Sequence, residues 1–161
     1  MNTNRTTAIL TAVLLAAMIG TASAQTATTP PPAAATTPES AYAGCKSAYE
    51  AGDFAAAAKR CRKAAELGSA KGQNGLATLY LSGQGVPKNI AKAAKWFGKA
   101  AAQGDPQALN NLATLYFNGD GVAEDRAKAV TLLRQAAAQG NVEAANNLKT
   151  IYQQFPALRP K

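Results

Sequence analysis

A period of 36 residues runs through the chain and limits what it can fold into. Residues 70–105 and 106–141 align without a gap and are identical at nearly half of their positions. The same interval separates three tyrosines and three glycines, which are Tyr80, Tyr116 and Tyr152, and Gly68, Gly104 and Gly140. A period of this size predicts stacked supersecondary units, each of which buries its apolar face against its neighbours.

Each unit is predicted to hold two helices. In residues 106–141 the first helix begins at Asp105-Pro106, because aspartate caps a helix well and proline suits its first position. Apolar residues then recur at helical spacing, at Ala108, Leu112, Leu115 and Tyr116. The second helix starts near Asp125 and stops at Gly140. Abundant alanine allows such helices to pack closely.

A glycine-rich loop joins the two helices of each full unit. It reads LYLSGQGVPKN at 79–89 and LYFNGDGVAED at 115–125. Glycine-rich loops can hold phosphate, but this one follows no predicted strand and lacks the lysine and hydroxyl of a P-loop. We therefore interpret it as a corner, in which the glycines adopt positive φ and Val86 and Val122 pack into the helix junction.

The segment NNLATLYFNGDGVAEDRAKAVTLLRQAAAQGN resembles a Sel-one-like repeat, a relative of the tetratricopeptide repeat. NGLATLYLSGQGVPKNIAKAAKWFGKAAAQGD matches the same pattern, and the Gly52-Asp53-Phe54 corner of the preceding unit resembles the shorter tetratricopeptide form. The resemblance implies an all-α, right-handed α-solenoid of helix-turn-helix repeats. It would comprise one short tetratricopeptide-like hairpin, two full 36-residue repeats and one terminal helix. The family resemblance also implies an adaptor role and no particular partner.

The N-terminal segment of the chain predicts export. Residues 1–24 combine Arg5, an apolar run and Ala22-Ser23-Ala24, which is typical of a signal peptide cleaved near Ala24. The alternative is a retained membrane anchor. Residues 25–37 are interpreted as a disordered Thr/Pro/Ala linker, 38–153 as the helical repeat domain and 154–161 as a C-terminal tail that either folds back or stays mobile. The mature protein is expected in the periplasm or outside the cell, with no stable membrane insertion.

Two cysteines can be placed by internal alignment. Cys45 lies four residues before Tyr49, as Leu112 lies before Tyr116, and Cys61 lies 36 residues before Phe97. Each cysteine thus replaces an apolar residue on one helix of the first hairpin, and the two should face each other. In an oxidising compartment they are predicted to form a disulfide, as in cysteine-rich members of the resembled family. The alternative is a pair of buried free thiols.

A groove for an extended peptide is one candidate site. In the resembled superhelix the first helices line the concave side, and helical spacing places a ladder of asparagines and threonines, with two apolar residues at its edge, opposite the core face. Its members are Asn74, Thr78, Leu81, Asn110, Thr114, Phe117, Asn146 and Thr150. Asparagine can bond a peptide backbone as donor and acceptor. The alternative is a solvated face that recent duplication has kept alike.

A basic outer face is the second candidate. It comprises Lys88, Lys92, Lys95 and Lys99, within a chain of 17 basic and 9 acidic residues. Loss of the signal peptide removes only Arg5 and lowers the net charge from +8 to +7. Such a surface favours an acidic protein or an anionic envelope polymer, although a merely solvated lysine face is the simpler interpretation. Nucleic acid is not expected, since no recognised binding module is present.

Catalysis, cofactors and metals are not expected. The chain has no histidine and two cysteines, which removes the commonest general base and a four-cysteine zinc site. Asp120, Glu124 and Asp125 cluster in sequence but lie at a corner and a helix start, where acidic residues are favoured for their charge. The sequence thus predicts a non-catalytic scaffold that binds a protein or peptide. The resemblance leaves open an inhibitor of a secreted toxin, or an envelope protein that binds glycan or β-lactam.

Overall fold

The computed structural model describes residues 36–159, and within them it is entirely helical, as predicted. The helices are α2 (Pro38–Glu50), α3 (Phe54–Glu66), α4 (Ala70–Ser82), α5 (Ile90–Ala102), α6 (Pro106–Asn118), α7 (Arg126–Ala138) and α8 (Val142–Gln154), followed by the short 3-10 helix η1 (Pro156–Leu158). The predicted signal peptide and most of the predicted linker lie outside the described residues. No helix within 36–159 is long and apolar enough to cross a membrane.

Side-chain caps define the start of every α-helix. Each residue that precedes a helix accepts a hydrogen bond from the backbone N–H three positions later, which satisfies a donor that the helix itself leaves unpaired. The caps are Thr37, Asp53, Ser69, Asn89, Asp105, Asp125 and Asn141. The helix starts that the sequence predicts at Asp105 and Asp125 are therefore confirmed.

The glycine-rich loop is a corner. Gly83 and Gly85 have φ of 76° and 68°, and Gly119 and Gly121 have 73° and 67°. A Cβ atom at Gly85 would overlap the carbonyl oxygen of Phe54, and one at Gly121 would lie 2.8 Å from the Ala91 nitrogen. Each loop thus packs on the start of the preceding unit's second helix, a place with no room for a side chain.

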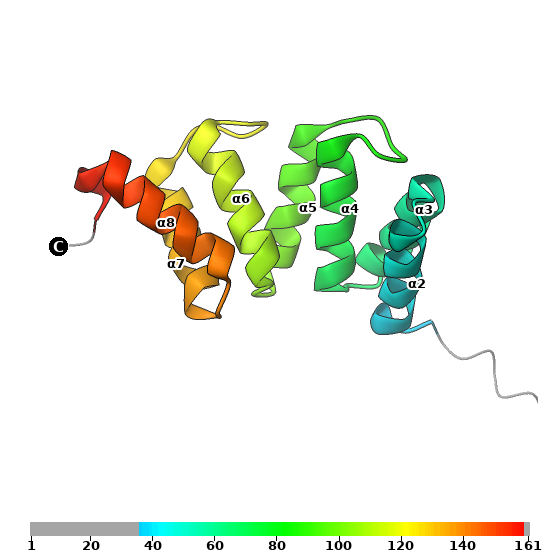
Figure 1. Cartoon of the computed structure of the whole chain (residues 1–161). Helices are drawn as coiled ribbons and strands as arrows, with labels where there is room; N and C mark the ends of the chain where they lie inside the picture. Colours follow the sequence, from blue (N-terminus) through cyan, green and yellow to red (C-terminus); the bar gives the residue numbers. More distant parts are fainter. Residues whose placement is uncertain (1–35, 160–161) are drawn as a thin grey trace, which may run out of the picture. The chain divides into compact units, whose positions relative to one another are not determined.

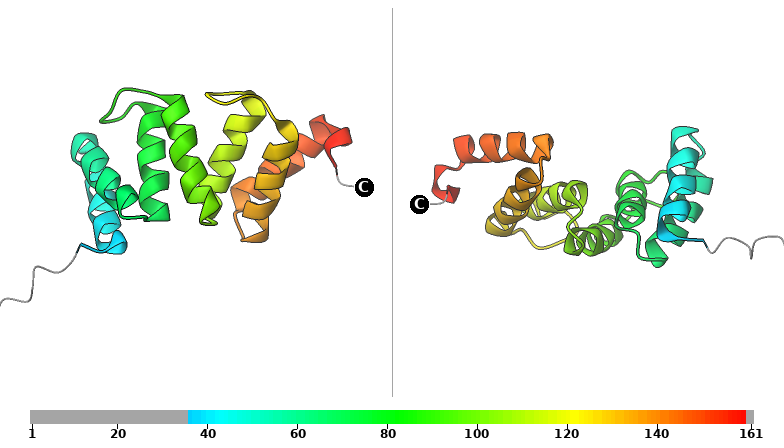
Figure 2. Two further views of the ribbon diagram at one scale, coloured as in Figure 1. Left: turned by 180° about the vertical axis from the view of Figure 1, so that it is seen from behind. Right: turned by 90° about the horizontal axis from the view of Figure 1, so that it is seen from below.

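Successive helices pack antiparallel in chain order, and α2 also contacts α4. The first helices α2, α4, α6 and α8 form what we call the first layer. The second helices α3, α5 and α7 form the second layer, which faces the viewer in the left panel of Figure 2. The right panel of Figure 2 shows that α2 and α8, at the two ends of the row, project to the same side. The first layer is therefore the hollow side of the helical unit.

Alanine and a few large apolar residues fill the space between the layers. Phe97, Leu76, Leu79 and Leu133 are the largest fully buried apolar side chains. Val86 and Val122 are half-buried against the same core, as predicted for the corner loops. Small side chains at most other core positions let the helix axes approach closely, so the burial that stabilises the fold is spread over many small contacts.

A disulfide joins Cys45 of α2 to Cys61 of α3, which confirms the predicted pairing. The two Cα atoms are 4.7 Å apart, and both residues are buried. Cross-linking a 16-residue separation restricts the unfolded chain, which stabilises the fold by about 3 kcal/mol in the chain-entropy model.

The C-terminal segment folds back onto the last hairpin. Phe155 and Leu158 join the core cluster that contains Leu109, Leu133 and Ile151. Since Leu158 lies 36 residues after Val122, it fills the place that the valine of the corner loop fills in the preceding unit. The segment thus covers α7 as a corner loop would.

Candidate binding site

Three threonines of the predicted groove lie at equivalent positions of α4, α6 and α8. Thr78 Oγ1 donates to the Asn74 carbonyl oxygen at 3.0 Å, and Thr114 and Thr150 make the same bond within their own helices. A threonine within a helix can donate its hydroxyl proton to the carbonyl oxygen four residues earlier, and each of these bonds uses the proton in that way. Each hydroxyl oxygen keeps its capacity to accept a hydrogen bond from a ligand.

Two of the three asparagines of the predicted ladder, Asn74 and Asn110, accept hydrogen bonds from asparagines of the next unit. Asn111 Nδ2 donates to Asn74 Oδ1 at 3.3 Å, and Asn147 Nδ2 donates to Asn110 Oδ1 at 2.9 Å. Asn110 is only 1% exposed, whereas Asn146, its equivalent in α8, is exposed. Asn110 therefore joins α6 to α8 and is closed to a ligand, while Asn146 remains open.

A cleft of about 160 Å³ lies between α6 and α8 and contains three of the predicted groove residues. We call it the C-terminal cleft. It is lined by Ala113, Thr114, Phe117, Leu133, Asn147, Thr150, Ile151 and Gln154. Phe117 is held in place by Phe155, edge-on at 5.7 Å between ring centroids, and by the Arg126 guanidinium at 5.3 Å from its ring. The cleft thus has a rigid aromatic wall beside two threonines.

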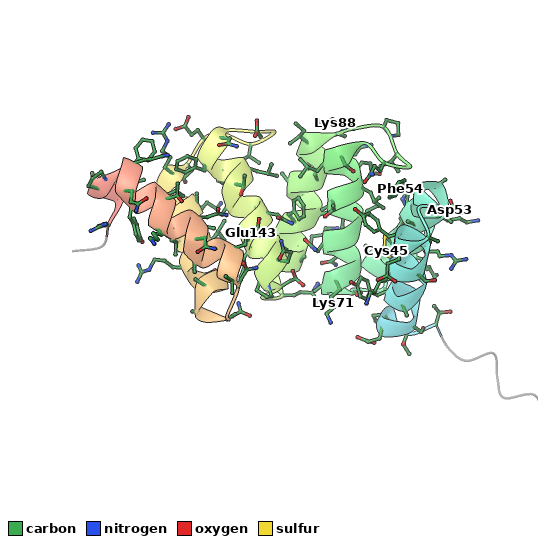
Figure 3. The ribbon with its side chains drawn as sticks, in the orientation of Figure 1. Cys45, Asp53, Phe54, Lys71, Lys88 and Glu143 are labelled. Atoms are coloured by element: carbon green, nitrogen blue, oxygen red, sulfur yellow. A yellow bond between two sulfur atoms is a disulfide. The ribbon has the colours of Figure 1, made fainter. Side chains whose placement is uncertain are left out.

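A second cleft, of about 220 Å³, lies at the other end of the first layer, between α2 and α4. We call it the N-terminal cleft. It is lined by Tyr42, Cys45, Lys46, Tyr49, Cys61, Gly75 and Thr78, so the disulfide forms part of its wall (Figure 3). Tyr49 is exposed and packs edge-on against Phe54 at 5.4 Å. Of these residues, only Thr78 was among the groove residues predicted from sequence.

Gly75 is the residue that opens this cleft. It occupies the position that Asn111 and Asn147 occupy in the next two units. A Cβ atom at Gly75 would lie 3.4 Å from the sulfur of both cysteines, so the glycine lets α4 lie directly against the disulfide. The departure from the asparagine pattern was a visible sequence signal, but it gains meaning only once the disulfide is placed beside it.

Leu81 and the four lysines of the predicted basic face lie outside both clefts. Leu81 is half-buried against the core. Lys92 Nζ lies 5.5 Å from the centre of the Tyr80 ring and Lys99 Nζ lies 4.2 Å from that of Trp96. Lys88, labelled in Figure 3, precedes α5 and is exposed. Lys95 lies on α5 and is also exposed. These four residues therefore belong to a surface separate from the clefts.

The clustered carboxylates have local structural partners. Asp125 caps α7, and Asp120 accepts a hydrogen bond from Asn118 Nδ2 at 3.2 Å. Glu124 Oε1 lies 2.8 Å from Arg126 Nε, an ion pair by distance although its angle is not that of a hydrogen bond. These contacts account for the placement of all three residues.

One tyrosine shifts the ionisation of a lysine beside it. Lys128 Nζ donates to the Tyr116 hydroxyl at 2.9 Å, and this hydrogen bond raises the pKa of Lys128 above its ordinary value. In the preceding unit the equivalent hydroxyl, of Tyr80, instead accepts from Arg62 at 3.2 Å. Both donors belong to second-layer helices, α3 and α7, and neither tyrosine lines either cleft.

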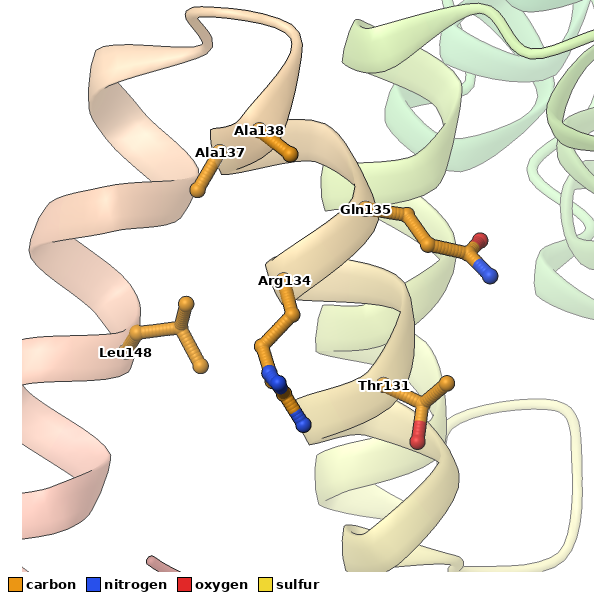
Figure 4. Close-up of a pocket in the computed structure, with 6 residues that line it drawn as sticks. All are labelled: Thr131, Arg134, Gln135, Ala137, Ala138 and Leu148. Atoms are coloured by element: carbon orange, nitrogen blue, oxygen red, sulfur yellow. The ribbon is translucent and has the colours of Figure 1, made fainter. Parts of the chain in front are cut away.

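An open hollow of about 520 Å³ lies between α7 and α8. Figure 4 shows Arg134 of α7 and Leu148 of α8 on its two walls, with Ala137 and Ala138 nearby. Its lining combines the polar side chains of Thr131, Arg134 and Gln135 with two alanines and one leucine, and it holds no aromatic side chain to anchor a ligand. We therefore rank it below the two clefts as a site for a specific partner.

The model of the Sel1 repeat matches residues 70–105 and 106–141. Among solved structures, a protective antigen of uropathogenic Escherichia coli with an SLR fold is 33% identical, with a TM-score of 0.68. The match covers 73% of this chain and 26% of the antigen. A Sel1 repeat protein from Oxalobacter formigenes is 31% identical, with a TM-score of 0.71, over 76% of this chain and 52% of the other.

Cysteine-rich protein B of Helicobacter pylori shares the fold at 24% identity and a TM-score of 0.56, over 69% of this chain and 94% of that one. The chain thus spans about a quarter of the Escherichia coli antigen and about half of the Oxalobacter formigenes protein. No curated protein matches it. Sel1 repeats typically mediate protein–protein interactions.

Proposed function

Since the chain belongs to the Sel1-repeat family through residues 70–141, we propose that it is an exported, non-catalytic scaffold that binds an extended segment of another protein. The segment would lie across α2, α4, α6 and α8. The observation that carries this proposal is the pair of clefts at the two ends of one layer, each combining aromatic walls with threonine.

The chemistry of the two clefts suits apolar side chains of a partner. Tyr42 and Tyr49 line one cleft and Phe117 lines the other, and aromatic side chains offer large contact areas with little entropy to lose. Thr78, Thr114 and Thr150 offer hydroxyl oxygens that accept backbone N–H groups between the two anchors. An extended segment with two apolar side chains and free backbone donors is the ligand that fits this surface.

Export is supported by the disulfide and by the predicted signal peptide. Disulfides persist in oxidising compartments and are rare in the cytosol of most organisms. The expected product of export begins at Gln25 and carries no free thiol. Mass spectrometry of the protein from the envelope fraction tests this: retention of residues 1–24, or two alkylatable cysteines, would overturn the location.

A blocking substitution tests the binding surface. Thr150→Arg places a long side chain at the C-terminal cleft, where Thr150 is exposed and its hydroxyl bonds within its own helix. Thr131→Arg is the matched control, because Thr131 is also an exposed helical threonine with the same internal bond, at 3.0 Å to the Ala127 carbonyl oxygen.

The disulfide-bonded chain and both variants are immobilised in envelope extract, and retained proteins are identified by mass spectrometry. A protein retained by the wild type and by Thr131→Arg, but lost with Thr150→Arg, supports the first layer as the site. Loss with Thr131→Arg alone would move the site to the hollow between α7 and α8. Retention by all three would contradict the proposal for the C-terminal cleft.

A further inference from the structure

Positive charge is concentrated on one of the two layers. The second-layer helices carry four basic residues in α3 and three each in α5 and α7, against Glu66 as their one acidic residue. The first-layer helices carry three lysines and three glutamates. The excess charge of the helical unit therefore lies on the face opposite the two clefts.

The acidic residues of the described chain do little to neutralise this layer. The side chains of Asp53, Asp105 and Asp125 cap the starts of α3, α6 and α7. Two ion pairs occur within residues 36–159, Lys46 with Glu50 in α2 and Arg126 with Glu124. No basic residue of α3 or α5 pairs with an acidic side chain of the described residues, so the positive field of these helices remains unscreened by the protein.

The cations also recur in register. Lys59 and Lys95 are separated by 36 residues, as are Lys63 and Lys99, and Lys92 and Lys128. Lys92 and Lys128 make the same contact in their units, each over the ring of the unit's tyrosine. Because a repeat presents equivalent positions to the same side, these residues form rows that cross the helices along the array.

We propose that the second layer binds a linear anionic polysaccharide laid across α3, α5 and α7. Rows of exposed lysine match a chain of regularly spaced carboxylates, which can contact several helices at once. This inference goes beyond the proposed function, because it assigns a second partner to the opposite face. A scaffold with both surfaces would hold its protein partner against an acidic glycan.

Two other polyanions fit the surface less well. A bilayer needs apolar anchors as well as charge, and the exposed large apolar residues of the described chain are Tyr49, Leu67 and Val142, none of which lies on α5 or α7. Single-stranded nucleic acid needs exposed aromatic side chains for its bases. Trp96, the tryptophan of this layer, is half-buried with Lys99 over its ring.

The test uses the chain purified from cells that express the whole sequence, with its disulfide intact. Binding to polygalacturonate oligomers is measured by isothermal titration at about 50 and about 200 mM NaCl, a range over which multi-contact ionic binding weakens markedly. We expect a steep loss of affinity with salt. The Lys92/Lys95/Lys99→Gln variant should bind at least about tenfold more weakly, given the contribution of each lysine near an anionic surface.

The matched control is Lys71/Lys149→Gln, which removes two positive charges from the first layer outside the two clefts and is compared with Lys95/Lys99→Gln of α5. It should bind within about twofold of the wild type, and circular dichroism checks that both variants fold. If the α5 variant fails to fold, Lys59/Lys63→Gln in α3 replaces it. Equal losses in both layers, no binding at low salt, or equally tight binding to duplex DNA or phosphatidylglycerol vesicles would overturn the proposal.

Discussion

The junction between α2 and α4 and the junction between α6 and α8 each join the first helices of successive units, but they are built differently. Asn147 bridges α6 and α8 through Asn110, whereas its equivalent Gly75 leaves α4 in contact with the disulfide. One junction is bridged by an amide hydrogen bond, and at the other α4 packs against a covalent link between α2 and α3. Equivalent repeat positions therefore share a fold without sharing a means of stabilisation.

Removing the covalent link should have the largest effect. The Cys45→Ala/Cys61→Ala variant is expected to lose about 3 kcal/mol of unfolding free energy, because the unfolded chain regains the entropy of a 16-residue separation. Urea denaturation followed by circular dichroism measures the loss. Reduced wild-type protein is the control and should show a similar loss. An unchanged midpoint would mean that the hairpin of α2 and α3 is held by packing alone.

Breaking the amide bridge is the corresponding test at the other junction. Asn110→Ala should cost about 1–3 kcal/mol, since it removes a buried amide that joins the two helices and leaves the half-buried Asn147 donor without its partner. Asn146→Ala is the matched control, because Asn146 is the exposed equivalent of Asn110, and its change should stay within about 0.5 kcal/mol. Equal costs for the two variants, measured by urea denaturation, would show that the bridge contributes nothing specific.

Gly75 should be coupled to the disulfide beside it. Alanine favours a helix over glycine by about 1 kcal/mol, but its Cβ would lie 3.4 Å from both sulfurs, at the short limit of ordinary contact. We therefore expect Gly75→Ala to stabilise the Cys45→Ala/Cys61→Ala protein by up to about 1 kcal/mol and to give little or no gain in the disulfide-bonded chain. A double-mutant cycle measures the difference. The same gain in both backgrounds would contradict the coupling.

The smallest expected effect is on the pKa of Lys128, which depends on the Tyr116 hydroxyl. The Tyr116 hydroxyl raises the pKa of Lys128, so any stability from this contact is complete below the ordinary lysine pKa of 10.5. It is lost as the pH rises through the higher folded-state pKa. NMR titration of Lys128 should show this raised value, and Tyr116→Phe should lower it. If Lys128 titrates at the same pH in the variant as in the wild type, the hydroxyl is not the cause of the raised pKa.

The repeat made most of the fold predictable. Helix starts follow from capping residues such as Asp105 and Asp125, and the disulfide follows from aligning Cys45 and Cys61 with core positions. These features depend on local spacing and on a register that the sequence repeats. The alignment worked because a stacked array places equivalent residues in equivalent surroundings.

The binding surface was less predictable because it depends on contacts between units. Helical spacing places Asn110 opposite the core of its own hairpin, yet α8 of the next unit covers it. The periodicity of one helix cannot show which neighbour buries its other side. The N-terminal cleft was missed for the same reason, since Gly75 is meaningful only beside a disulfide contributed by two other helices.

The C-terminal segment lets the array be lengthened from within. Leu158 lies where the register of the repeat expects the valine of a corner loop, and the segment covers α7 by itself. A 36-residue unit inserted between Asn141 and Val142 would leave both the disulfide hairpin and the folded-back segment intact. For protein engineering and for gene duplication alike, an internal insertion keeps the packing at both ends of the helical unit.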